Sequence, residues 1–518
     1  MRPFQQFRVW ARRAPTSERL AALVVVIVLA AGVILAIPSD GDDAPRTGAD
    51  AGALATGEGL TAGAVDGSGA GTVARSQVAA GTEAAAQPVA GSSVSAETGA
   101  AVRTAGTDGG CVSPPGSDQG ITEQEIKIAL FLVELAGETG NAAFNVPPAR
   151  EQRTAYEAIV DEINKTGGVA CRQLKVLYFT INPVDQAQLR QTCLDVVEAE
   201  VFYALDLGGY AAFPAIADCY VQNEIPFYEG NFIPQSQVEK GYPYMFAAST
   251  QDNLFFNAVF GLKQKGFYDP AQGFKKLGYI YRECIPEHPR KVLAWLQQAG
   301  VPSAQTVQYN LGCPVGLYAS PSDIAQAVLR FQQNGVTHVL THGSSDWFAF
   351  SRVAQQQRYK PRYGVTDQST SFASYGTNGP DWNNIDGSLL ISNYRFNEER
   401  TPGLTPTAGT ERCRRIMAPR GQKHMYEQQI GMSGVACNQL WFFESAVNHA
   451  PELKRTALAE GLRRGGPIDF SYPYGPSTFP TPKTTYHGNF WWTQTAHADC
   501  SCWTIADPTF RPTFPGFS

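Results

Sequence analysis

Short apolar runs alternate with amphipathic segments along most of the chain, and this alternation most constrains the fold. Residues 125–133 (Glu-Ile-Lys-Ile-Ala-Leu-Phe-Leu-Val) are typical of a buried strand. Residues 150–165 place Tyr156 and Ile159 on one face of a helix, which 166–168 (Thr-Gly-Gly) would end. Strands that alternate with helices of this length predict parallel sheets with right-handed crossovers. We therefore expect an α/β fold.

The alternation runs through the chain twice. The first series predicts strands at 174–180, 202–207 and 225–228 and helices at 185–200 and 208–220. The second predicts helices at 254–265, 290–299, 323–334 (N-cap Ser322) and 346–357, and strands at 276–281, 306–310, 337–341, 361–366 and 389–394. The remainder predicts helices at 410–417, 434–450 and 453–464, and strands at 485–494 and 502–505. Two similar series indicate two lobes with a cleft between them: lobe 1 at about 111–251 plus 396–470, and lobe 2 at about 252–395 plus 471–518.

The N-terminus predicts a membrane anchor. Residues 1–19 carry five arginines, and residues 20–37 form an apolar run without a charge. Such a run is about long enough to span a bilayer, and its basic flank should stay in the cytoplasm. We expect a transmembrane signal-anchor at 20–37 with the folded part outside; a cleaved signal peptide is the alternative. A lipoprotein anchor is excluded because the first cysteine is Cys111.

The next segment, 38–110, is rich in Ala, Gly, Ser and Thr and contains no aromatic residue and no lysine. It has too little apolar surface to offset the entropy of ordering, so we expect a disordered linker that separates the anchor from the folded part.

Composition and motifs exclude several classes of function. The chain has 41 Lys+Arg against 47 Asp+Glu, a net charge of −6. This balance argues against nucleic acid as a partner, because binding it requires dense positive charge. The sequence contains no G-x-S-x-G elbow, no H-E-x-x-H and no P-loop. We expect neither an enzyme nor a bound cofactor.

Three segments in order resemble the type I periplasmic-binding-protein receptors of the Leu/Ile/Val-binding family. Residues 120–128 (Gly-Ile-Thr-Glu-Gln-Glu-Ile-Lys-Ile) resemble the opening of these receptors. Residues 158–169 (Ala-Ile-Val-Asp-Glu-Ile-Asn-Lys-Thr-Gly-Gly-Val) resemble their first helix and its exit, and 174–185 match the next strand and loop. The resemblance implies two Rossmann-like lobes with parallel sheets joined by a hinge. It also implies a solute bound between the lobes, which close on it.

The resemblance, carried over to the ends of the strands, gives candidate ligand-binding residues. These are Glu138, Gly209, Tyr210, Gly230, Asn231, Asp252, Ser344, Ser345, Asp346 and Asp367. Asp367 falls where amino-acid receptors carry the acid that pairs with the ligand ammonium. Tyr210 and Ser344 or Ser345 depart from the pattern of amino-acid receptors. An alternative is therefore an aromatic-rich pocket, including Tyr210 and Trp347, that receives an apolar or planar solute.

Ten cysteines in an oxidising compartment favour disulfides. We expect pairing within lobes, as Cys111–Cys171, Cys193–Cys219, Cys284–Cys313 and Cys413–Cys437. Cys500 and Cys502 pair either with each other or with cysteines elsewhere. A metal site at these two cysteines with His497 is the alternative that we do not favour.

These features predict a membrane-tethered, extracytoplasmic solute-binding protein that delivers an amino acid or a related amide or organic compound to an ABC permease. We expect a monomer with no metal and no nucleic-acid partner. The alternative is a ligand-sensing or scaffold protein of the same fold that is not coupled to transport.

Overall fold

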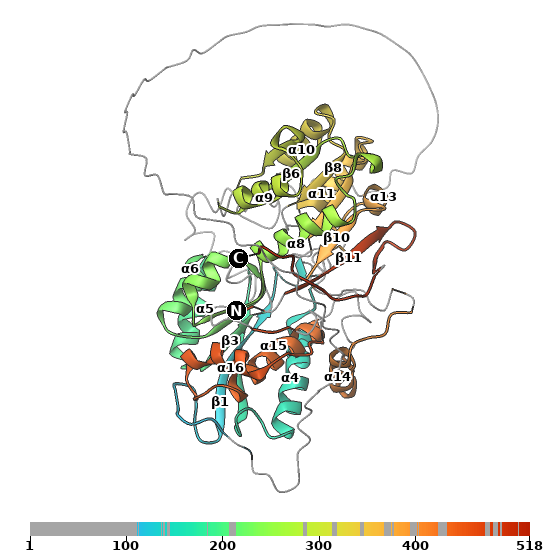
Figure 1. Cartoon of the computed structure of the whole chain (residues 1–518). Helices are drawn as coiled ribbons and strands as arrows, with labels where there is room; N and C mark the ends of the chain where they lie inside the picture. The colour runs from blue at the N-terminus through green and yellow to red at the C-terminus, as the bar shows by residue number, and fades with distance from the viewer. Residues whose placement is uncertain are drawn as a thin grey trace, which may run out of the picture. The chain divides into compact units, whose positions relative to one another are not determined.

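The chain from Glu125 onward folds into two sheets flanked by helices, one parallel and one mostly parallel (Figure 1). This computed structural model describes residues 111, 113–135, 137, 140–141, 146–183, 185–206, 214–282, 287–312, 319–341, 346–366, 374–375, 378–393, 401, 403–422, 432–471, 477–479, 485–486, 489–505 and 507–517. All of these residues belong to one unit, Gly99–Ser518. The predicted segments 1–19, 20–37 and 38–110 lie outside the described residues. Within the described part, no helix is both long and apolar enough to cross a membrane.

The first sheet has five parallel strands in the order β2-β1-β3-β4-β5. Their bounds are β1 Glu125–Val133, β2 Gln173–Ile181, β3 Tyr203–Asp206, β4 Phe227–Ile233 and β5 Met245–Thr250. β1 pairs with β2 along its whole length, from Glu125 opposite Gln173 to Val133 opposite Ile181. Its last eight residues except Lys127 are buried, so both faces of the strand need a covering layer.

Helices cover both faces of this sheet. α5 Gln186–Glu198, α6 Pro214–Gln222 and α7 Gln235–Gly241 contribute to one core. α4 Ala149–Lys165 contributes to the other, together with three helices from later in the chain: α14 Ala408–Met417, α15 Met432–Asn448 and α16 Leu458–Gly465. Figure 1 shows α15 beside α4. Tyr156 of α4 donates a hydrogen bond to Gln439 Oε1 of α15 over 2.7 Å, which ties the returning chain to the first layer.

The second sheet has the order β12-β11-β10-β9-β8-β6-β7, with β13 pairing β11. Its strands are β6 Leu277–Tyr281, β7 Thr306–Asn310, β8 His338–Thr341, β9 Arg362–Thr366, β10 Leu389–Ser392, β11 Phe490–His497, β12 Cys502–Ile505 and β13 Arg511–Pro512. β6 to β10 are parallel, whereas β11 to β13 pair in the antiparallel sense.

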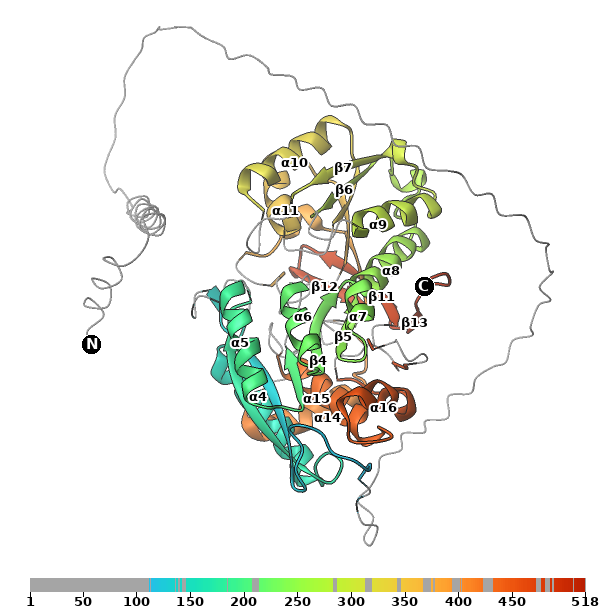
Figure 2. The same ribbon diagram turned by 90° about the vertical axis from the view of Figure 1, so that its left-hand side faces the viewer.

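Helices also cover both faces of the second sheet. α8 Gln251–Gln264 and α9 Glu287–Gln298 pack on one face, and α10 Pro321–Gln333 and α11 Asp346–Gln356 on the other (Figure 2). The short helix α13 Trp382–Ile385 lies beside α11. Short 3-10 turns occupy Pro270–Gln272, Ser303–Gln305, Ala418–Arg420 and Arg455–Ala457.

The structure corrects three local predictions. Ser320, not Ser322, caps α10: its hydroxyl accepts the Asp323 N–H over 3.1 Å, and Pro321 fits the first helical turn. α16 begins at Leu458 rather than at 453, because a 3-10 turn precedes it. α7 and β5 were not predicted, and β5 completes the edge of the first sheet.

The second crossing of the chain into lobe 2 lies later than the predicted position 471. Phe479 belongs to the core of the first sheet. Tyr486 forms a parallel bridge with Ala247 of β5, and Thr485 donates a hydrogen bond to Met245 O over 2.7 Å. Residues 479 and 485–486 therefore pack with the first sheet, and the chain enters the second sheet at β11.

Disulfides join Cys111–Cys171, Cys193–Cys219 and Cys413–Cys437, as the sequence predicts, and Cys500 pairs with Cys502. Cys284 and Cys313 lie outside the described residues. Cys193–Cys219 ties α5 to α6, and Cys413–Cys437 ties α14 to α15. These bridges fasten helices that cover the same sheet.

Candidate functional site

Two buried amide side chains hold the carboxyl end of β1. Gln152 accepts the Val133 N–H over 2.8 Å and donates to Val133 O over 2.7 Å. Asn141 Oδ1 accepts the Leu135 N–H over 2.6 Å. The loop that carries the predicted residue Glu138 therefore starts from a fixed backbone, while Glu138 itself lies outside the described residues.

A β-bulge occupies the predicted site residues of β4. Glu229 is opposite Ala247 of β5, but Phe232 is opposite Ser249, so β4 has one extra residue between these pairs. Gly230 and Asn231 lie in this interruption. A bulge breaks the ladder and re-aims the strand, and bulges are common next to functional sites. The structure thus supplies, at the carboxyl end of β4, backbone geometry suited to a ligand contact.

Tyr228 lies just before the bulge and is fully buried. Burial, and to a lesser extent the neighbouring Glu229 carboxylate, raises the pKa of Tyr228 well above its ordinary value. The phenol is therefore neutral at physiological pH, and this part of the sheet gains no charge from it.

Asp252, a predicted ligand residue, is bound by protein groups. It lies in the first turn of α8 and is buried. Its Oδ2 accepts the Gln235 N–H over 2.9 Å, and its Oδ1 lies 2.5 Å from Lys291 Nζ. Because both oxygens have partners, Asp252 joins α7, α8 and α9 where the chain passes between the sheets.

Asp346, another predicted ligand residue, forms a two-point ion pair. Arg282 Nε lies 2.6 Å from Oδ2, and Arg282 NH2 lies 2.8 Å from Oδ1. Oδ1 also accepts the Ala319 N–H over 2.7 Å. Arg282 directly follows β6 and Asp346 begins α11, so the pair fixes the carboxyl end of the second sheet. The planar guanidinium group of Arg282 thus makes two hydrogen bonds to one carboxylate, which fixes its orientation and makes the ion pair stronger than a single contact.

Two buried hydroxyls at the same end of this sheet lack partners. Thr341 is the last residue of β8 and Thr366 the last of β9, and their exposed fractions are 2% and 0%. Neither Oγ1 has a hydrogen-bond partner in the described structure. A buried polar atom without a partner is costly and calls for an explanation such as a ligand. Sequence reasoning missed both residues, although a threonine ending an apolar strand was the available signal.

The other predicted ligand residues lie outside the described residues. They are Glu138, Gly209, Tyr210, Ser344, Ser345 and Asp367. In the sequence, Asp367 directly follows Thr366 of β9, and Ser344 and Ser345 follow Thr341 of β8 after two intervening residues. Asp252 and Asp346 bind different cations and are not brought into one ion-pair network.

Trp347, the described member of the aromatic alternative, is buried. Its exposed fraction is 1%, and it packs against Phe348 and Trp503 in the core beneath the second sheet. Tyr210 lies outside the described residues, so the aromatic alternative stays a prediction.

Residues 126–498 match the family model described as periplasmic binding protein. The chain belongs to the periplasmic binding protein family. No curated protein sequence matches it. The match covers the first sheet from Ile126, the second sheet through β11, and the six described site residues from Gly230 to Thr366; β12 and β13 follow it.

Solved periplasmic binding proteins and their relatives share the fold at low sequence identity. The structure is similar to a Rhodopseudomonas palustris solute-binding protein in complex with 4-hydroxybenzoate (13% identity, 76% of this chain and 99% of that chain, TM-score 0.56). It is also similar to the branched-chain amino acid binding protein LivJ of Streptococcus pneumoniae in complex with isoleucine (12%, 76% and 100%, 0.54). A fatty acid ABC transporter substrate-binding protein from Thermomonospora curvata gives 14%, 77% and 94%, with a TM-score of 0.54.

In this periplasmic binding protein, a buried amide cluster joins three chain segments near the start of α8. Asn253 Oδ1 accepts hydrogen bonds from Asn257 Nδ2 over 2.8 Å and from Asn393 Nδ2 over 2.9 Å. Asn253 and Asn257 also donate to Thr513 Oγ1, over 3.3 and 3.2 Å. The cluster therefore ties α8 to the end of β10 and to the C-terminal segment.

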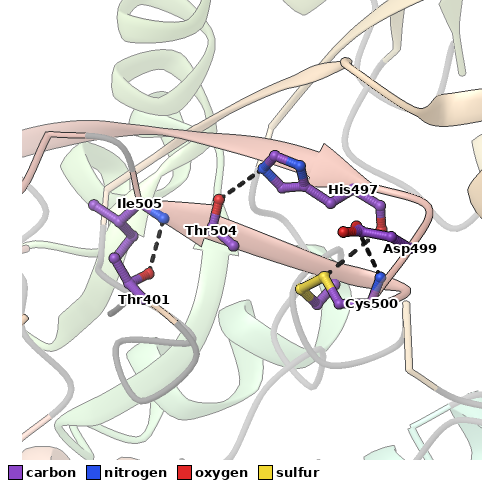
Figure 3. A pocket seen from close by; sticks show the side chains of 7 residues that line it. Thr401, His497, Asp499, Cys500, Thr504 and Ile505 are labelled. Carbon is purple, nitrogen blue, oxygen red and sulfur yellow. Dashed lines mark hydrogen bonds between the residues drawn. A yellow bond between two sulfur atoms is a disulfide. The ribbon is translucent and has the colours of Figure 1, made fainter. Parts of the chain in front are cut away.

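A cavity of about 660 Å³ lies on the β11–β12 hairpin of the binding protein (Figure 3). His497, Asp499 and Cys500 line it, and the two cysteines of the hairpin form a disulfide with each other. The described residues contain no group of three or more His, Cys, Asp or Glu that could hold a metal ion. The pairing of Cys500 with Cys502 occupies the sulfur atoms that the metal alternative requires.

Proposed function

We propose that this chain is an extracytoplasmic solute-binding protein, tethered to the membrane by residues 20–37. It captures a small solute between its two lobes, which close on it, and delivers it to an ABC permease. The observation that carries the proposal is the pair of buried, unpartnered hydroxyls of Thr341 and Thr366 at the carboxyl ends of neighbouring strands. In open α/β sheets, ligands bind at this edge.

The site favours a small solute with a polar head group. The two threonines can each donate and accept a hydrogen bond, and the bulge at Gly230 offers backbone groups from the other sheet. Amino acids and related amides or organic acids carry such groups. Solved relatives bind isoleucine and 4-hydroxybenzoate, which fall within this chemical range.

The disulfides support a location outside the cytoplasm. Cys193–Cys219 and Cys413–Cys437 each join two helices that cover the first sheet, and Cys111–Cys171 joins two segments outside its helices and strands. Disulfides of this kind persist in oxidising compartments and are rare in the cytoplasm. The basic segment 1–19 before the apolar run is consistent with an anchor whose folded part lies outside.

A thermal-shift screen of the full chain in detergent tests solute capture. The panel contains branched-chain amino acids, short amides, hydroxybenzoates, fatty acids and sugars. A ligand at 100 times its Kd stabilises the folded state by about 2.7 kcal/mol, which raises the Tm visibly. No shift with any compound, in protein that melts cooperatively, would contradict solute capture.

Coupling to a permease is tested separately. Cells that lack this chain should lose uptake of the solute found in the screen, and the full chain should restore it. Unchanged uptake, with binding intact, would favour the sensing or scaffold alternative.

A further inference from the structure

The Cys500–Cys502 disulfide encloses a much shorter loop than the other three described bridges. It encloses one residue, whereas Cys111–Cys171, Cys193–Cys219 and Cys413–Cys437 span 60, 26 and 24 positions. The entropy that a bridge removes from the unfolded chain grows with the enclosed loop. This bridge therefore contributes least to the stability of the fold, and stabilisation does not explain its presence.

The two cysteines of this bridge are unequally accessible. Cys500 is exposed in the turn between β11 and β12, whereas Cys502 has an exposed fraction of 3%. Cys502 lies opposite His497 in the hairpin and is held in β12. Figure 3 shows Cys500 at the tip of the hairpin. A thiolate from solution can therefore reach the sulfur of Cys500. The buried sulfur of Cys502 is then the leaving group.

The turn itself holds a strained backbone. Ser501, between the two cysteines, has a φ of +47°, in the left-handed region that side chains other than glycine rarely adopt. Such strain persists only where the surroundings impose it. Here the bridge closes the turn together with the Ser501 N–H, which donates to Ala498 O over 3.2 Å, and with the pairing of His497 and Cys502. Opening the bridge removes one of these constraints.

Hydrogen bonds hold several of the residues that line the cavity beside the bridge. His497 Nε2 and Thr504 Oγ1 are 2.8 Å apart across the hairpin, and Thr401 Oγ1 accepts the Ile505 N–H over 3.0 Å. These contacts fix the residues that line the cavity of about 660 Å³ in front of Cys500. This volume is in the range of pockets that hold small molecules.

We propose that the Cys500–Cys502 bridge is a thiol–disulfide exchange site for a small-molecule thiol. The thiolate of the first thiol attacks Sγ of Cys500, the bond between the two sulfurs breaks, and Cys502 leaves as a thiolate that takes a proton from solvent. A second thiolate attacks the external sulfur of the mixed disulfide and releases the Cys500 thiolate, which is then protonated. In total, two thiols are oxidised to one disulfide, and the bridge is reduced to two thiols.

Asp499 sets the rate of this exchange through its charge. Its Oδ1 accepts the Cys500 N–H over 2.9 Å, so a carboxylate lies beside the sulfur under attack. A negative charge there repels an incoming thiolate. For two unit charges about 6 Å apart in water, this repulsion slows attack roughly threefold. Asp499→Asn should therefore exchange roughly threefold faster at low salt, and the difference should shrink at high salt. A purely structural role of Asp499 would not depend on salt in this way.

Native exchange of the full chain with reduced glutathione is the decisive experiment. After timed incubation, free thiols are alkylated and the cysteine peptides are identified by mass spectrometry. We expect Cys500 and Cys502 to be labelled first, while the other bridges stay intact and the fold is retained. Reduction of this bridge only together with the others, or only on unfolding, would overturn the proposal.

Two single variants locate the attacked sulfur. Cys502→Ser leaves an exposed Cys500 and should form a stable mixed disulfide with oxidised glutathione. Cys500→Ser, the matched control, leaves a buried Cys502 and should react at least tenfold more slowly. Equal reactivity, or faster reaction at Cys502, would overturn the assignment of Cys500. Reaction with a protein dithiol but not with glutathione would overturn the assignment to a small thiol. The glutathione experiment on the unaltered chain stands even if a variant misfolds.

Discussion

Asn393 donates a hydrogen bond to Asn253 over 2.9 Å and so joins the end of β10 to the first turn of α8, 140 positions earlier in the chain. Both side chains are buried, and Asn257 donates to the same oxygen of Asn253. One amide oxygen thus serves two segments that pass between the lobes. These buried hydrogen bonds hold the two segments in a fixed position relative to each other, because moving either segment would break one of them.

Asn253→Ala should destabilise the protein by about 2 kcal/mol, because it removes the buried acceptor that the Asn257 and Asn393 amides share. Denaturant unfolding, followed by tryptophan fluorescence, measures the loss. Asn223→Ala is the matched control: Asn223 is exposed and caps only its own helix through Cys219 O, so its removal should matter much less. Equal effects of the two substitutions would contradict the importance of the amide cluster.

Arg282→Met should destabilise the protein by about 3 kcal/mol, because it leaves the buried Asp346 carboxylate without its cation. The midpoint of urea unfolding is the measurement. Lys240→Met serves as the control, since the Lys240–Asp218 pair is exposed and surface pairs contribute little. If the Arg282 variant were as stable as the control, the two-point pair would not be what holds the edge of the second sheet.

Thr341→Val should weaken solute binding about tenfold without loss of stability in the free protein. The valine keeps the shape of the side chain and removes a buried hydroxyl that has no protein partner. Calorimetric titration and a melting curve measure the two quantities. Thr192→Val is the control, because its hydroxyl bonds Gln188 O within α5 and should not affect binding. A loss of stability with unchanged affinity would reject Thr341 as a ligand contact.

His338 makes stability depend on pH in the acidic range. Burial, together with the nearby Arg362 cation, lowers the pKa of His338 to about 4, against about 6.5 in the unfolded chain. The unfolded state therefore binds the proton first as pH falls, and stability is lost between about pH 6.5 and pH 4, by on the order of 3 kcal/mol. The ring packs edge-on against Phe267 and Phe274, which keep water from it.

His338→Asn removes this titration, so its free energy of unfolding should fall less between pH 7 and pH 4.5 than that of the unaltered chain. The variant should be less stable already at pH 7, because the aromatic contacts of His338 are lost. The test is therefore the change in the free energy of unfolding with pH, not its value at one pH. Identical slopes would show that His338 is accessible to protons in the folded state.

The alternation of strands and helices could be predicted because each element carries its own pattern. β1 is a continuous apolar run, and α4 buries Tyr156, Ile159 and Ile163 at helical spacing. β5 could not be predicted in this way. Gly241 and Pro243 precede it and suggest a loop, and its sequence, Met-Phe-Ala-Ala-Ser-Thr, lacks bulky apolar residues after the second position. The neighbouring strand β4 and residues 485–486 supply its pairing, and those contacts are not local in the sequence.

The predicted ligand-binding residues stay a prediction, and the partners of two of them could not be predicted. Asp252 and Asp346 lie in the first turns of α8 and α11, where Lys291 and Arg282 bind them. Lys291 and Arg282 are 39 and 64 positions away from the acids that they bind, so no local sequence pattern could predict these ion pairs. In the sequence, Thr341 and Thr366 look like ordinary strand residues; the structure shows that both are buried without partners at the carboxyl ends of neighbouring strands.

The distance between labels on the two lobes, measured with and without the solute found in the screen, tests capture by lobe closure most directly. Leu194 on α5 and Leu329 on α10 are exposed, and unnatural amino acids at these positions accept labels without disturbing the disulfides. The proposed function predicts that saturating solute shifts the distance distribution to a shorter, narrower population, and that Thr341→Val requires about tenfold more solute for the same shift. An unchanged distribution at saturating solute would contradict capture by closure.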